Sequence, residues 1–102
     1  IENTIDKAIS IGKEQYGYSS NILLEGNNLI SNNIGIAVKD SSFAIIKNNS
    51  FVKNHTAIYL YKKDISSIGG IAEINNNIFS NNIREIHVDS YHGAEELLSD
   101  NS

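Results

Sequence analysis

The chain has 102 residues, a net charge of −4 and no cysteine. Its length allows at most one domain, and the lack of cysteine excludes disulfides and thiolate metal sites. Its eight basic residues are scattered among twelve acidic ones, so the clustered Lys and Arg of a nucleic-acid-binding surface are missing and no nucleic-acid partner is expected. No apolar run approaches the roughly 18 residues of a transmembrane helix, so no membrane span is expected.

One pattern of residues occurs three times along the chain. It reads [IL]-x-[NG]-N-x-[FL]-x-x-N-x-x-x-I-x-[VL] and begins at Leu24, Ile46 and Ile74, after a partial copy at Ile9-x-Ile11. The complete copies begin 22 and 28 residues apart, and the difference in length lies between the I-x-[VL] element and the next copy. Insertions confined to one corner of a fixed repeat are typical of a solenoid.

Short strands are expected within each copy. In chain order, the segments GIAV (35–38), AIYL (57–60) and EIHV (85–88) alternate apolar residues with others, which is the pattern of half-buried strands. Ile and Val favour strands, whereas Asn is poor in both helices and strands. Each copy is therefore predicted to contain two or three short strands separated by tight turns.

Two repeat folds have this spacing, the leucine-rich repeat and the parallel β-helix. A leucine-rich repeat places Asn three residues after the second apolar position of its strand, where this chain has Ser41, Lys63 and Tyr91. The sequence therefore favours a parallel β-helix, in which successive coils stack about 4.8 Å apart.

The asparagines of the pattern are predicted to build the corners of the coils. Gly26 occupies the place of Asn48 and Asn76, as expected where the backbone angles are left-handed. Stacked coils would align the remaining asparagines in two columns whose amides hydrogen-bond from coil to coil. The first column is Asn27, Asn49 and Asn77, and the second is Asn32, Asn54 and Asn82.

Alternation predicts three inward-facing columns, one for each strand of a coil. They are Ile9, Ile11, Ile36, Val38, Ile58, Leu60, Ile86 and Val88; then Leu24, Ile46 and Ile74; then Leu29, Phe51 and Phe79. Burial of each side chain contributes about 1.5–3 kcal/mol, so a coil gains most of its stability from stacked neighbours. With so few coils, we expect the chain to be part of a larger protein or to need caps.

At this point the sequence resembles a known family. The succession G-I-x-V, S-S and I-x-N-N-x-F-x-x-N, clearest in GIAVKDSSFAIIKNNSFVKNHT (35–56), is similar to right-handed parallel β-helix proteins of the pectate-lyase-like superfamily. NosD-type and carbohydrate-binding or sugar-hydrolysis repeats are the most similar. The resemblance covers roughly residues 8 to 90. It implies an all-β, right-handed, single-stranded parallel β-helix of three to four coils in a secreted or cell-envelope protein.

The C-terminal segment of the chain differs from the repeated pattern. Residues 1–93 are expected to form the coils, and residues 94–102 a C-terminal cap or tail. The segment AEELL within 94–102 has helix-like composition, so a short helix is predicted there. Such a helix would cover the last coil and its open strand edge, which would otherwise favour end-to-end or edge association.

The outward positions of the I-x-[VL] strand are the candidate binding residues. Stacking is predicted to place Tyr59 beside His87, and Tyr61 beside Asp89, with Lys39 in the column of Tyr61. Two phenol rings, an imidazole and a carboxylate can hold a sugar by ring contact and hydrogen bonds. The alternative is that these residues are ordinary exposed cross-strand pairs.

The residues give little support to catalysis or metal binding. Glu85 and Asp89 lie four strand residues apart, about 13 Å, whereas glycosidase carboxylates need roughly 5–5.5 or 6.5–9.5 Å. Glu85, His87 and Asp89 lack a further nitrogen or sulfur ligand, so neither a metal nor another cofactor is expected. The Asp-Asp pair and Gly-His-Gly of similar polygalacturonases are missing, and Arg84 is the single arginine, against the acid cluster and Arg base of pectate lyases.

Three functions remain open on these grounds. The preferred one is a non-catalytic β-helix module that binds carbohydrate or serves as a structural part of a larger secreted or envelope protein. The second is the C-terminal coils of a polysaccharide lyase or glycoside hydrolase. The third is a protein-interaction or assembly module that uses its uncapped edges.

Overall fold

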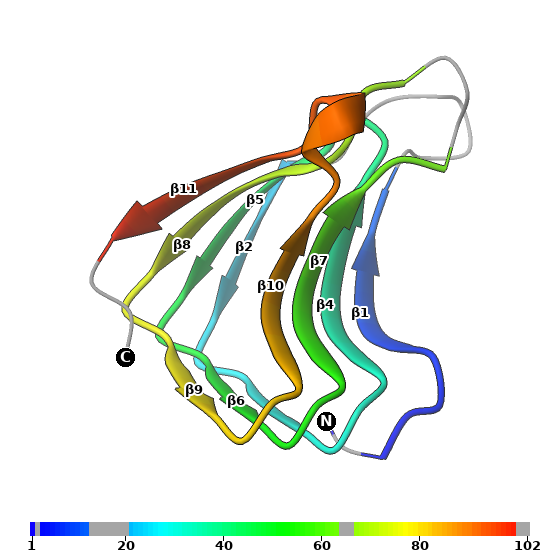
Figure 1. The fold of residues 1–102 in the computed structure, drawn as a ribbon. Coiled ribbons are helices and arrows are strands. Elements are labelled where there is room, and N and C mark those ends of the chain that lie inside the picture. The colour runs from blue at the N-terminus through cyan, green and yellow to red at the C-terminus, as the bar shows by residue number, and fades with distance from the viewer. Residues whose placement is uncertain (2, 13–20, 64–66, 100–102) are drawn as a thin grey trace.

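The structure is a computed structural model that describes residues 1, 3–12, 21–63 and 67–99. Within these ranges the chain forms eleven short strands and one turn of 3₁₀ helix (Figure 1). The elements are β1 (Lys7–Ile11), β2 (Asn21–Glu25), β3 (Asn28–Ile30), β4 (Ile34–Lys39), β5 (Phe43–Lys47), β6 (Ser50–Val52), β7 (Thr56–Tyr61), β8 (Ile71–Asn75), β9 (Ile78–Ser80), β10 (Arg84–Val88), η1 (Ser90–His92) and β11 (Glu95–Ser99).

The described strands form three sheets, and each of the first three coils contributes one strand to each sheet, whereas the last coil contributes β10 and β11 to the first and second sheets. The strand orders are β1-β4-β7-β10 for the first sheet, β2-β5-β8-β11 for the second and β3-β6-β9 for the third. Every pairing is parallel. The register aligns Leu24 with Ile46 and Ile46 with Ile74, as the repeated pattern predicts. The predicted parallel β-helix is therefore confirmed.

The core lies between the three sheets and consists of the predicted inward columns. In the middle coils Ile36, Ile58 and Phe51 are completely buried, and the Phe51 ring stacks on Phe79 at a centroid distance of 5.1 Å. Toward the two ends of the solenoid, some predicted residues are only partly buried, namely Ile9, Leu24, Phe79, Ile86 and Val88, whereas Ile11 and Leu29 of the first coil are buried. Sequence reasoning missed two buried alanines of the second sheet, Ala44 and Ala72.

Both predicted asparagine columns are present as hydrogen-bonded ladders. Asn49 Oδ1 accepts from the backbone N and the Nδ2 of Asn27, at 2.9 and 3.0 Å, and Asn77 Oδ1 accepts from the same two groups of Asn49. In the second column, Asn54 Oδ1 accepts from the backbone N and the Nδ2 of Asn32, and Asn82 Oδ1 accepts from the same two groups of Asn54. The later rungs of both columns also donate their Nδ2 to a strand carbonyl of the preceding coil, as Asn54 does to Leu29 O at 2.8 Å.

The corner between the second and third sheets has the left-handed backbone expected from its Gly and Asn residues. Gly26, Asn48 and Asn76 have φ angles of 74°, 57° and 60°. The corner between the third and first sheets is also left-handed, at Ser31, Lys53 and Asn81, and this column was not predicted. A left-handed angle costs a residue such as Lys53 about 1–2 kcal/mol, and the coil-to-coil hydrogen bond from Lys53 N to Ser80 O helps to offset it.

The prediction of a C-terminal helix is wrong. Residues 95–99 form strand β11, which pairs in parallel with β8 and places Leu98 beside Ile74. A five-residue segment is too short to nucleate a stable helix, whereas the edge of β8 offers a full row of backbone partners. The sequence contains a hint of this strand, because Leu98 and Asn101 have the same spacing as Ile74 and Asn77, the apolar position and the ladder asparagine of the repeated pattern. A capping role for residues 94–102 stays a prediction.

The ladders predict a large difference between buried and exposed asparagines. Asn54→Ala removes the acceptor of two Asn32 N–H groups and the donor to Leu29 O, all within the interior. We expect the free energy of unfolding in urea to fall by about 2–4 kcal/mol. Asn33→Ala makes the same change at an exposed neighbouring position and should cost less than about 0.5 kcal/mol. Equal losses for the two variants would contradict the ladder as a source of stability.

The left-handed corner predicts opposite effects of two substitutions at Gly26. A side chain there meets nothing within 4 Å, so only the backbone angle matters. Gly26→Asn should raise the free energy of unfolding by about 0.4–1 kcal/mol, because Asn tolerates the angle and restricts the unfolded chain. Gly26→Val should lower it by about 1–2 kcal/mol, because a β-branched residue is strained at this angle. Thermal denaturation of both variants tests the order, and a Val variant as stable as the Asn variant would refute the explanation.

Candidate functional site

The outward face of the first sheet brings most of the predicted site residues together. Tyr59 and His87 are neighbours in the register of β7 and β10, and their rings stack at 4.5 Å with an interplanar angle of 9°. The Tyr61 ring stacks on the other side of Tyr59 at 4.3 Å and 15°. The three rings therefore form one pile along the axis of the solenoid, with both faces of Tyr59 covered.

The position of the Tyr61 ring depends on a small neighbour. In the register of β4 and β7, Ala37 lies beside Tyr59 and Lys39 beside Tyr61. Ala37 faces outward by alternation and yet is completely buried, since the rings stand beside it. A larger residue at position 37 would occupy the space into which Tyr61 turns to meet Tyr59.

Two lysines frame the stacked rings. The Lys39 side chain extends over Gly12, the residue after β1, where an added Cβ would lie 2.7 Å from Lys39 Cε. Lys7, the first residue of β1, is hydrogen-bonded to Asp6 at 3.2 Å, and its charge is near enough to the Tyr61 phenol to affect the pKa of that group. We call Lys7, Lys39, Tyr59, Tyr61 and His87 the ring face. Sequence reasoning missed Lys7, because β1 precedes the complete copies of the pattern.

The electrostatics of the ring face affect Tyr61 and Lys7. Burial raises the pKa of the Tyr61 phenol above its ordinary value of 10.0, and the nearby Lys7 ammonium opposes this shift. The hydrogen bond to Asp6 raises the pKa of Lys7 above 10.5. Both groups are therefore protonated at neutral pH, so Tyr61 can donate a hydrogen bond and Lys7 carries a positive charge.

Asp89 lies at the edge of this face and has a partner that the sequence did not suggest. Its backbone N–H donates to Leu60 O at 2.8 Å, which continues the pairing of β10 with β7. Its carboxylate Oδ2 lies 2.6 Å from His92 Nδ1 in η1. The Asp89 side chain thus contacts the 3₁₀ turn that follows β10, and its pairing with Tyr61 stays a prediction.

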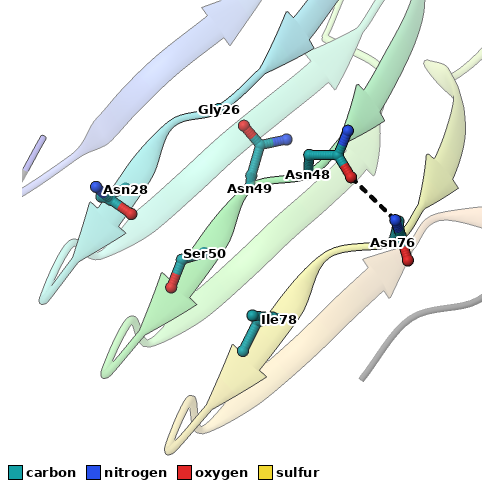
Figure 2. Close-up of a pocket in the computed structure, with 7 residues that line it drawn as sticks. All are labelled: Gly26, Asn28, Asn48, Asn49, Ser50, Asn76 and Ile78. Atoms are coloured by element: carbon teal, nitrogen blue, oxygen red, sulfur yellow. Dashed lines mark hydrogen bonds between the residues drawn. The ribbon is translucent and has the colours of Figure 1, made fainter.

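A second concave surface lies at the corner between the second and third sheets (Figure 2). This amide groove has a volume of about 250 Å³ and is lined by Gly26, Asn28, Asn48, Asn49, Ser50, Asn76 and Ile78. Asn76 Nδ2 donates to Asn48 Oδ1 at 3.1 Å, and Asn48 Nδ2 donates to Glu25 Oε2 at 3.3 Å. Sequence reasoning treated these residues as scaffold and did not predict a groove.

Metal ligands and membrane-spanning helices are two further features that bear on function. In the part of the chain that the structure describes, no three His, Asp or Glu side chains gather where they could hold a metal ion. Among the same residues, no helix is long and apolar enough to cross a membrane.

Comparison with known proteins gives one match. The model of the family described as "Right handed beta helix region" matches residues 2–101 of the chain. Searches of curated proteins and of solved structures found no match.

The raised pKa of Tyr61 predicts a loss of stability at high pH. The unfolded phenol loses its proton from about pH 10, whereas the folded one keeps it to a higher pH. The stabilising contribution is therefore complete below pH 10 and is lost as the pH rises through the folded pKa. Tyr61→Phe removes this titration, so its unfolding free energy should fall less steeply above pH 10. Parallel pH profiles in urea denaturation would contradict this account.

Proposed function

Because the chain belongs to the right-handed β-helix family, we propose that it is a non-catalytic β-helix module that binds carbohydrate on the ring face. The main support is the pile of three rings between two lysines. Side chains held by each other on a sheet lose little conformational entropy when a ligand binds. The family itself supplies the scaffold, and the proposal rests on the side chains that stand on it.

The stacking decides how a sugar would bind. Since both faces of Tyr59 are covered, a sugar cannot lie flat on this ring. It would instead meet the edges of the rings and hydrogen-bond to the phenol hydroxyls and the imidazole, which combine an apolar body with a polar tip. Lys39 and Asp89 would add charged partners at the border of the face.

We further propose that the module belongs to a larger secreted or cell-envelope protein. The support for this is the resemblance of GIAVKDSSFAIIKNNSFVKNHT (35–56) to sugar-associated β-helix repeats. A role as the C-terminal coils of a polysaccharide lyase or hydrolase is less favoured, because in the described residues Glu85 and Asp89 stand on an edge strand without a cluster of acids around them.

A second candidate function is assembly through the C-terminal end of the solenoid. There Phe79, Ile86 and Val88 are only partly buried, whereas their counterparts Phe51, Ile58 and Leu60 one coil earlier are completely buried. Strands β9 and β10 are also the last described strands of their sheets, and unpaired edges favour association. Sedimentation that depends on protein concentration would support this function.

Carbohydrate binding on the ring face predicts selective effects of tyrosine substitutions on a glycan array. Tyr59→Ala and Tyr61→Ala should weaken binding about tenfold or more, because they remove the central rings of the contact surface. Tyr91→Ala is the matched control, since Tyr91 is 91% exposed on η1 and outside the ring pile. Its binding should be unchanged.

Two results would refute the proposal in its binding form. One is that the wild-type protein retains no glycan from the array. The other is that Tyr59→Ala binds as tightly as Tyr91→Ala while melting curves show both variants folded.

A further inference from the structure

The amide groove is formed by two parallel columns of side chains that cross three coils (Figure 2). One wall is the left-handed corner column of Gly26, Asn48 and Asn76. The other wall is the column of Asn28, Ser50 and Ile78, which are register partners in β3, β6 and β9. The rung Asn49 of the buried ladder lies between them. The groove therefore runs along the solenoid axis, across the strands.

The groove is lined mainly by residues with amide or hydroxyl side chains and carries no charge of its own. Its lining contains four asparagines and one serine, and none of the lining residues is ionisable. Amide and hydroxyl groups both donate and accept hydrogen bonds, which suits ligand hydroxyl groups and does not favour an anion or a cation. Within the described residues, the Asn28 and Ser50 side chains hydrogen-bond to no other residue, so they can serve a ligand without disturbing the fold.

The two ends of the groove differ in a way that suits a sugar chain. At the first coil Gly26 has no side chain, and an added Cβ would meet nothing within 4 Å, so this end is open. At the third coil Ile78 is 58% exposed and offers an apolar contact. Sugar rings carry hydroxyl groups at their rims and C–H groups on their faces, and such rings match a wall of amides that ends in an apolar side chain.

The spacing of the groups also has a consequence for the ligand. Successive coils stack about 4.8 Å apart, so the wall positions 26, 48 and 76 repeat at that interval, as do 28, 50 and 78. A ligand with regularly repeated hydroxyl groups can meet equivalent partners on successive coils, and the contacts then add within one molecule. A single small polyol would use one coil only.

We propose that the amide groove is a binding site for a neutral oligosaccharide that lies along the solenoid axis. Asn28 and Ser50 hydrogen-bond to its hydroxyl groups, the exposed amides of Asn48 and Asn76 line its other side, and Ile78 contacts a ring face. The site is separate from the ring face, because the two surfaces share no residue, and it does not require that the ring face binds a ligand.

The experiment is an NMR titration of the ¹⁵N-labelled chain with neutral cello-, manno- and malto-oligosaccharides. The side-chain amide signals of Asn28, Asn48 and Asn76 should shift, and that of Asn33 should not. The double variant N28A/S50A should bind about tenfold more weakly, which corresponds to about 1.4 kcal/mol. Tyr91→Ala lies outside both the groove and the ring face and should bind these ligands like the wild type, and glucose should bind more weakly than its oligomers.

The outcomes separate this site from the ring face. Shifts confined to Tyr59, Tyr61 and His87 would overturn the groove proposal and support carbohydrate binding on the ring face. Absence of any shift up to the solubility limit of all three oligosaccharides would also overturn it. Unchanged affinity of the folded N28A/S50A variant would do the same, whereas loss of affinity in N28A/S50A but not in Tyr91→Ala, together with shifts of the groove amides, would establish it.

Discussion

The fold depends on the buried asparagine ladders more than on any other interaction. A tight corner leaves backbone N–H groups that the strands cannot pair, and an unpaired buried group costs about 1–3 kcal/mol. In Asn49, Asn54, Asn77 and Asn82, the Oδ1 accepts two hydrogen bonds from the preceding coil, and the Nδ2 donates one to a strand carbonyl of that coil. The same atoms therefore satisfy the corner and fix the height and register of each coil on the next.

Both candidate surfaces are consequences of this fixed register. A slip of one residue would turn every side chain of a strand to the opposite face and would send the site tyrosines inward. With the register held, Tyr59 lies beside His87 on the outward face of the first sheet, while Asn48 and Asn76 meet at the outer corner. Of the ladder rungs only Asn49 also lines the groove, but the ladders determine which residues become neighbours on both surfaces.

The sequence predicted those features that repeat with a fixed spacing. The core columns, the two ladders and the neighbours Tyr59 and His87 follow from period and alignment alone. The turn of Tyr61 toward Tyr59 did not follow, because it depends on a side-chain rotamer and on the space beside Ala37. β11 was missed because the local composition of AEELL favours a helix, whereas pairing with β8, a long-range contact, decides its conformation.

The confinement of length variation to one corner gives the fold a further property. Two corners of every coil are short and left-handed, at Gly26, Asn48 and Asn76 and at Ser31, Lys53 and Asn81, so a duplicated coil would join its neighbours without a change in geometry. Each added coil would lengthen both the ring pile and the groove by one step of about 4.8 Å. Duplication of the gene segment that encodes one coil would thus adjust the length of the solenoid, in steps of one coil, to the length of a polymeric ligand.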